Sequence, residues 1–181
     1  MTIGSADASV LFTRSRPVRA VGREVRELIA DLIVTMRRAR GVGIAAPQIG
    51  VPARVLIAGT GTDLLALVNP RMRRRWGSQL GPEGCLSMPG VVADVRRAFG
   101  VEVDARSVTG RQVRVRATGF LSRILQHEID HLDGILFLDR LDSPRGARAR
   151  DRERGPFRAG PRPPRRDASG RPVRRTRRSR R

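Results

Sequence analysis

Two histidines and a glutamate stand close together near residue 130, in a spacing typical of metal-dependent hydrolases. His127 and His131 are four residues apart, and Glu128 directly follows the first histidine. Residues four apart lie on one face of a helix, so both imidazoles can bind one metal ion with the carboxylate beside the metal's open position. These are the only two histidines among the 181 residues, which favours a metal site over two unrelated helical histidines.

A hydrolytic metal needs a third protein ligand and leaves one position for water. The sequence follows the H-E-x-x-H-x-x-G-x-x-H pattern of one metalloprotease class as far as Gly134, but Phe137 stands where the third histidine would be. The acids downstream of the helix lie at the end of the domain or in the C-terminal tail: Asp139, Asp142 and Glu153. Cys85 is the remaining soft donor. As a lone cysteine it is either a thiolate ligand or a small buried side chain.

The elements that must position these residues follow from the apolar pattern. Between residues 21 and 38, apolar residues recur at spacings of three and four, which predicts an amphipathic helix. Segments of alternating apolar and polar residues predict half-buried antiparallel strands at 54–58, 64–68, 91–95, 101–104 and 111–116. A second helix is expected to start after Thr118-Gly119 and to run to about Leu132. We therefore predict an α+β fold in which antiparallel β-strands pack around a central metal-binding helix, with an N-terminal amphipathic helix.

The net charge of +20 lies mostly in the last 38 residues. Residues 144–181 hold 16 arginines and three acids, and their only sizeable apolar side chains are Phe157 and Val173. Such a segment buries too little apolar surface to offset its ordering entropy, so we expect a catalytic domain at 1–143 and a disordered Arg/Pro-rich tail at 144–181. Codon bias of a GC-rich genome is one explanation for the charge, since every basic residue is arginine; contact with ribosomal RNA is the other.

The apolar runs are short compared with the roughly 18 to 20 residues that span a bilayer. The N-terminal residues carry Asp7 and lack the continuous apolar stretch of a secretory signal. We therefore expect a cytoplasmic protein without a membrane segment.

Three blocks of the sequence, in this order, resemble the signatures of the peptide deformylase family. They are Gly41-Val42-Gly43-Ile44-Ala45-Ala46-Pro47-Gln48, then Glu83-Gly84-Cys85-Leu86-Ser87, then Gln126-His127-Glu128-Ile129-Asp130-His131. The likeness extends over roughly residues 17 to 141, and the tail lies outside it. It implies an enzyme that removes the formyl group from N-formyl-methionyl nascent chains and releases formate.

The resemblance also implies a role for individual residues. Cys85, His127 and His131 would bind one divalent metal ion, with Fe(II) as the metal that the family suggests and Zn(II), Ni(II) or Co(II) compatible with the same donors. Glu128 would move the proton of the attacking water to the leaving amine. The side-chain amide of Gln48 and the backbone N–H of Leu86 would bind the developing oxyanion.

For the substrate, the resemblance implies backbone pairing and an apolar pocket. The loop at Gly43 and the backbone of Gly84 would bind the peptide as an added strand, while Val42, Phe120 and Ile124 would line the pocket for the methionine side chain. Core packing is the alternative role for Phe120 and Ile124.

Two other functions remain open from the sequence. One is a related metal amidohydrolase with a different acyl preference, because the contacts that separate formyl from acetyl are not visible in the sequence. The other is a non-catalytic nucleic-acid-binding protein that uses the arginine-rich tail. We expect the chain to be a monomer.

Overall fold

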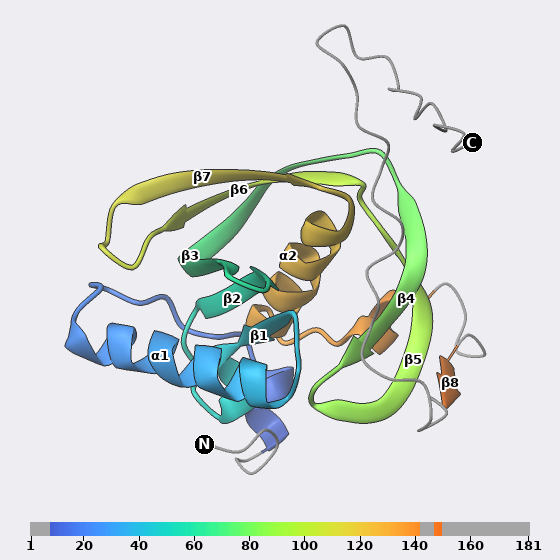
Figure 1. Cartoon of the computed structure of the whole chain (residues 1–181), viewed down its shortest axis with the longest axis horizontal. Coiled ribbons are helices and arrows are strands. Elements are labelled where there is room, and N and C mark those ends of the chain that lie inside the picture. Colours follow the sequence, from blue (N-terminus) through green and yellow to red (C-terminus); the bar gives the residue numbers. More distant parts are fainter. Residues whose placement is uncertain (1–7, 142–146, 150–181) are drawn as a thin grey trace, which may run out of the picture.

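The computed structural model describes residues 8–141 and 147–149, which form two antiparallel sheets and two long helices (Figure 1). The long helices are α1 (Arg23–Arg38) and α2 (Gly119–Leu132), and the short 3-10 helices are η1 (Ala8–Phe12), η2 (Ala46–Ile49) and η3 (Phe137–Arg140). The strands are β1 (Gly43–Ala45), β2 (Val55–Thr60), β3 (Asp63–Trp76), β4 (Gln79–Cys85), β5 (Met88–Arg97), β6 (Gly100–Arg106), β7 (Gln112–Thr118) and β8 (Ala147–Ala149).

The larger sheet has the order β1-β2-β3-β6-β7 and separates the two long helices. Successive side chains along each strand point to opposite faces of the sheet, because the backbone is pleated. Leu56 and Ala58 of β2 pack in the core cluster that contains α2, whereas Val55 and Ile57 pack in the cluster that contains α1. Strand β2 is therefore buried on both faces.

The smaller sheet, in the order β4-β5-β8, lies on the other side of α2 (Figure 1). Strand β4 pairs with β5 from Gln79 opposite Arg97 to Cys85 opposite Met88, with a shift of register between Gly84 and Cys85. Cys85 thus lies at the end of β4 that faces α2, and it packs with Phe137 of η3.

Helix α2 is enclosed between the two sheets, and every residue from Ser122 to Leu132 is buried. Because such a helix has no solvent-facing side, its polar side chains must find partners inside the protein. Gln126 does so with the loop before β6: its amide donates to the carbonyl of Ala98 at 3.0 Å and accepts from the Ala98 N–H at 3.1 Å.

The elements agree largely with the sequence-based expectations. The helices occupy Arg23–Arg38 and Gly119–Leu132, and the five expected strands lie within or largely overlap β2, β3, β5, β6 and β7. Strands β1 and β4 were not predicted. Among the described residues, no helix has the length and apolar character needed to span a membrane.

The expectation for the C-terminal tail needs one correction. Residues 144–146 and 150–181 lie outside the described residues, but Ala147–Ala149 forms β8 beside Val91–Ala93 of β5. These three residues are therefore paired rather than disordered. The physical reason is that the outer edge of β5 offers unpaired backbone groups, and pairing with them requires no apolar side chains.

Candidate metal centre and active site

Cys85, His127 and His131 form the candidate metal centre. One donor atom from each residue lies within 4.8 Å of the others, and all three residues are buried. The Sγ atom of Cys85 is 3.2 Å from Nε2 of His131. Helix α2 supplies the two histidines one turn apart, and the end of β4 brings the thiol to them across the space between strand and helix.

Glu83 orients the first histidine. Its Oε2 atom is 3.0 Å from Nδ1 of His127, which leaves Nε2 of that ring to face the centre. Period-two alternation along β4 places Glu83 and Cys85 on the same buried face of the strand. A carboxylate behind a histidine ligand fixes both its tautomer and its ring orientation.

Burial and the neighbouring charged groups together determine the pKa of Glu83, His127 and His131. Burial raises the pKa of Glu83, but hydrogen bonds from His127 and Arg97 outweigh this effect and hold the pKa at about 2. Burial lowers the pKa of His127, yet hydrogen bonds with Cys85 and Glu83 raise it to about 10. Burial, together with repulsion from His127, lowers the pKa of His131 to about 3. His131 is therefore neutral at pH 7, as a metal ligand must be, and binding at His127 displaces a proton.

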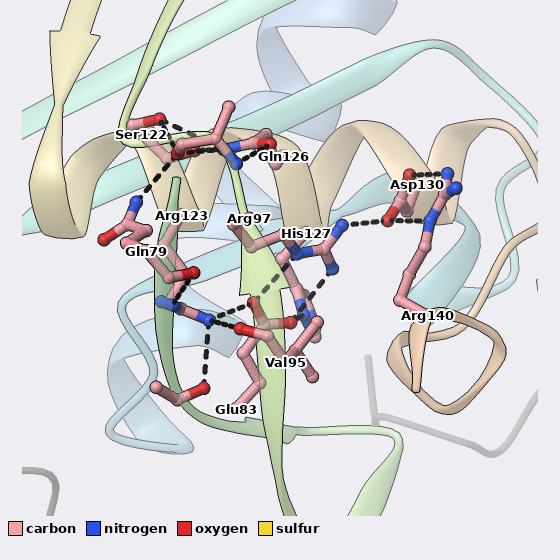
Figure 2. Close-up of polar contacts among 12 residues, drawn as sticks. Gln79, Glu83, Val95, Arg97, Ser122, Arg123, Gln126, His127, Asp130 and Arg140 are labelled. Carbon is pink, nitrogen blue, oxygen red and sulfur yellow. Dashed lines mark hydrogen bonds and ion pairs between the residues drawn. The ribbon is translucent and has the colours of Figure 1, made fainter. Parts of the chain in front are cut away.

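A buried ion network continues from Glu83 along α2 (Figure 2). Arg97 of β5 donates to both oxygens of Glu83 at 2.9 Å and also pairs with Asp130. Arg140 of η3 donates to both oxygens of Asp130, at 2.7 and 3.1 Å. The network ties β4, β5, α2 and η3 to the carboxylate that orients His127.

Arg123 forms a second connection between α2 and the smaller sheet (Figure 2). Its guanidinium donates to the carbonyl of Val95 at 2.9 Å, the carbonyl of Gly81 at 3.1 Å and the carboxylate of Glu83 at 2.8 Å. The side chain is 8% exposed, so these bonds lie in the interior. Arg123 therefore clamps the strand that carries Cys85 onto the helix that carries the histidines.

Glu128 faces the pocket beside the histidines and is 4% exposed. Its Oε2 atom is buried without a hydrogen-bond partner among the described residues. Burial raises its pKa to about 7, which suits a group that accepts and returns a proton near neutral pH. A Cβ at Gly43 would lie 2.3 Å from Oε1 of Glu128, so only glycine at position 43 admits this carboxylate.

Gln48 is held with its amide group toward Cys85. Its Oε1 atom accepts the backbone N–H of Ala45 at 2.8 Å, which turns Nε2 toward Ser87 Oγ at 3.2 Å and Cys85 Sγ at 3.6 Å. Leu86 lines the same pocket with its side chain against the α1 core cluster. The amide of Gln48 therefore lies beside the thiol, and Leu86 directly follows Cys85 in the chain.

These residues surround one pocket of about 810 Å³ between the 39–43 loop, β4 and α2. Every site residue expected from the sequence lines it except His131, which lies behind the others and is 1% exposed. The expected residues that line it are Val42, Gly43, Gln48, Gly84, Cys85, Leu86, Phe120, Ile124, His127 and Glu128. Ile124 and Phe120 also contact the α2 core cluster, so they serve both packing and the pocket wall.

The chemistry of the donors fits a divalent transition metal. One thiol and two imidazoles converge in a buried space, and the set suits Fe(II), Zn(II), Co(II) or Ni(II). The unpartnered Oε2 of Glu128 is the buried polar atom that a bound water would satisfy. The three protein donors leave a fourth position for that water.

Sequence reasoning missed the residues that support the site. The sequence places Glu83 within a family motif, but it indicates no role for Arg123 and no ion pair of Arg97 with Glu83 or Asp130. Strand alternation from Cys85 back to Glu83 is a signal that could have found the first of these. The arginines come from elements far apart in the chain, and no local pattern joins them.

Comparisons with known proteins agree on one family. The polypeptide deformylase family profile matches residues 1–146. A peptide deformylase of Thermomicrobium roseum is 48% identical over 134 residues, covering 69% of this chain and 76% of that protein. The crystal structure of the Thermus thermophilus enzyme has a TM-score of 0.75 and 40% identity, covering 78% of this chain and 86% of that one. A Met-Ala-Ser-bound class I type b peptide deformylase from Acinetobacter baumannii has a TM-score of 0.74 and 33% identity, with 78% and 98% coverage.

Proposed function

Because this chain belongs to the polypeptide deformylase family, we propose that it removes the formyl group from N-formyl-methionyl polypeptides and releases formate. The observation that carries the proposal is the convergence of Cys85, His127 and His131 beside Glu128 in one pocket. The complete set of candidate metal ligands and the buried carboxylate of Glu128 favour an active enzyme over a non-catalytic nucleic-acid-binding protein. The relatives favour the deformylase over an amidohydrolase with another acyl preference.

Cys85, His127 and His131 would hold the metal, which in this proposal is Fe(II). When bound, such an ion polarises a carbonyl oxygen and lowers the pKa of a coordinated water. Glu83 would keep the His127 ring in place through Nδ1, and Arg97 and Arg123 would keep Glu83 charged and oriented.

Glu128 would carry the proton through the reaction. Its raised pKa of about 7 allows it to take a proton from water as the formyl carbon is attacked. It would then return that proton to the amine nitrogen as the C–N bond breaks, giving formate and a free N-terminal methionine. Nε2 of Gln48 and the N–H of Leu86 would donate to the developing oxyanion between them.

The pocket walls would select the substrate. Val42, Phe120 and Ile124 provide apolar surface beside Glu128, which suits a methionine side chain. The backbone at Gly43 and Gly84 borders the same pocket, and an extended peptide would pair with it as a strand. The Acinetobacter relative that holds Met-Ala-Ser supports this class of ligand.

The basic tail supports a second, separate proposal, a contact with ribosomal RNA. Its 16 arginines against three acids give the polyanion-binding charge that would hold the enzyme near nascent chains. Co-sedimentation with ribosomes across a salt series tests this, comparing the full chain with a full-length variant in which all 16 arginines of residues 144–181 are replaced by glutamine. Equal pelleting of both at low salt would rule the contact out.

The experiment that tests the enzymatic proposal compares two substrates. Anaerobically purified protein of known metal content is assayed for formate from formyl-Met-Ala-Ser and for acetate from acetyl-Met-Ala-Ser. We expect formate only, and we expect Glu128→Ala to lose most turnover while keeping its metal, since it removes the proton carrier and no ligand. Acetate release, or no product from a fully metallated protein repeated with Ni(II), would overturn the proposal.

A further inference from the structure

On one face of the larger sheet, α1 packs mainly over β1, β2 and the first part of β3. Helix α1 contacts β1 and β2, and its core cluster includes Val55 and Ile57 of β2 and Val68 of β3. Val68 pairs with Arg106 of β6, which in turn pairs with Gln112 of β7, so this row continues on the same face. From Arg71 toward Trp76, the side chains that β3, β6 and β7 place on this same face are mostly charged.

Arginine dominates this part of the sheet, which we call the basic sheet face. Register places Arg71, Asp104 and Arg114 in one row and Arg74, Glu102 and Arg116 in the next. The six arginines of the basic sheet face are Arg71, Arg73, Arg74, Arg106, Arg114 and Arg116. Only two acids interrupt them: Asp104 pairs with Arg73 at 3.2 Å and Arg114 at 2.7 Å, and Glu102 lies 3.9 Å from Arg116. The face therefore keeps a clear excess of positive charge.

An aromatic ring lies at the end of this basic face. Trp76 pairs with Gly100, and a Cβ at position 100 would come within 2.1 Å of the indole, so the glycine is what lets the ring lie against β6. The guanidinium of Arg116 is 5.1 Å from the ring centroid. The side chain of Arg116 is 72% exposed. Its movement from the indole to a phosphate would uncover one side of the Trp76 ring for a nucleobase.

A hollow of about 730 Å³ continues the face at its other end. Its charged lining residues are Arg14 and Arg16 of the N-terminal segment, Arg54, and Arg71, Arg106 and the acid Asp104 of the sheet. Within the described part of the chain, Arg16, Arg71 and Arg106 form no ion pair with an acid. Arg14 has a partner, Asp133, at 3.6 Å. Guanidinium groups without acidic partners are the groups that bind phosphate most readily.

We propose that the basic sheet face and its hollow bind RNA, with the arginines on successive phosphates and a base stacked on Trp76. The charge selects a polyanion and excludes the chain's own basic tail as the occupant, because the two carry the same sign. A positive surface with a partly exposed aromatic ring is the combination that proteins use to bind single-stranded nucleic acid. The proposal does not depend on deformylase activity, since the face shares no residue with the pocket at Cys85.

Trp76 provides a direct test, because the chain has one tryptophan and no tyrosine. The full-length protein is titrated with a 16-nucleotide single-stranded RNA of mixed sequence, and with inorganic polyphosphate of similar charge as a probe without bases. We expect saturable quenching of Trp76 fluorescence by RNA and little change with polyphosphate. Unchanged fluorescence at saturating RNA, or equal changes with both probes, would overturn the base contact.

A charge-matched pair of full-length variants separates the face from the tail. One variant carries Arg16→Gln, Arg71→Gln and Arg106→Gln; the control carries Arg26→Gln, Arg37→Gln and Arg38→Gln on exposed positions of α1. If each face arginine binds one phosphate, the slope of log K against log salt falls by about 2 in the first variant only. Formate release should be unchanged in both, which verifies folding. Equal slopes in the two variants would refute the proposal.

Discussion

Replacing Glu83 with glutamine tests whether the ion network supports the metal centre. Glu83 accepts two hydrogen bonds from Arg97, one from Arg123 and one from His127, and it is 5% exposed. Glutamine keeps the shape but offers one acceptor, and its NH2 group faces other donors. Removing one partner of a buried ion pair costs about 3 to 5 kcal/mol, so we expect a loss of stability of this size. Loss of the carboxylate behind a histidine ligand should also weaken metal binding by roughly 10- to 100-fold.

The assay measures urea unfolding of the metal-free protein and metal affinity by competition with a chelator. Glu102→Gln is the matched control, because Glu102 is a half-buried acid on β6 whose arginine partner is 3.9 Å away. We expect the control to change stability by less than about 0.5 kcal/mol and to leave metal affinity unchanged. Should Glu83→Gln unfold at the same urea concentration and bind metal as tightly as the control, the supporting role of the network would be wrong.

Three further predictions concern the same site. Gly43→Ala should lower kcat at least tenfold with metal retained, because the added methyl meets Glu128 at 2.3 Å; Gly22→Ala, with no atom within 4 Å of its Cβ, is the control, and equal kcat values would contradict the geometry. Cys85→Ser should lower the bound metal per protein in elemental analysis, since an alcohol is a poorer ligand than a thiolate, and unchanged stoichiometry would make Cys85 a packing residue. The pKa of Glu83 falls from 4.5 to about 2 on folding, so its stabilisation, about 3 kcal/mol by linkage, is complete above pH 4.5 and lost as the pH falls through 2. The difference in unfolding free energy between the wild type and Glu83→Gln should therefore shrink between pH 5 and pH 2, and a constant difference would contradict the assigned pKa.

Local sequence patterns predict an element correctly where one of its faces is apolar. The spacing of apolar residues predicts a helix at 21–38, and α1 occupies Arg23–Arg38. The H-E-x-x-H spacing predicts that His127 and His131 share a helix face, and the structure places their ring centroids 4.9 Å apart. Such predictions succeed because they need only the geometry of the element itself.

Strand β4 shows where local patterns fail. Its sequence contains Gly81, Pro82 and Gly84, which have low strand propensity, so no strand was expected at Gln79–Cys85. The strand forms because β5 pairs with it along its length and Arg123 binds its carbonyl groups. These are contacts between distant segments, and a single sequence does not reveal them. Strand β3 likewise continues to Trp76 because β6 pairs with its arginine run.

Helix α2 explains why the metal ligands and the ion network lie together. A helix that is buried on all sides must satisfy every polar side chain internally, and α2 carries seven polar residues between Ser122 and His131. One face presents His127, Glu128 and His131 to Cys85 and the pocket. The neighbouring positions Arg123 and Asp130 bind the smaller sheet and η3. Since β4 supplies both Glu83 and Cys85, any displacement of the strand would disturb the network and the ligand set together. Rigidity of the site therefore depends on the same buried charges that hold the two sheets to the helix.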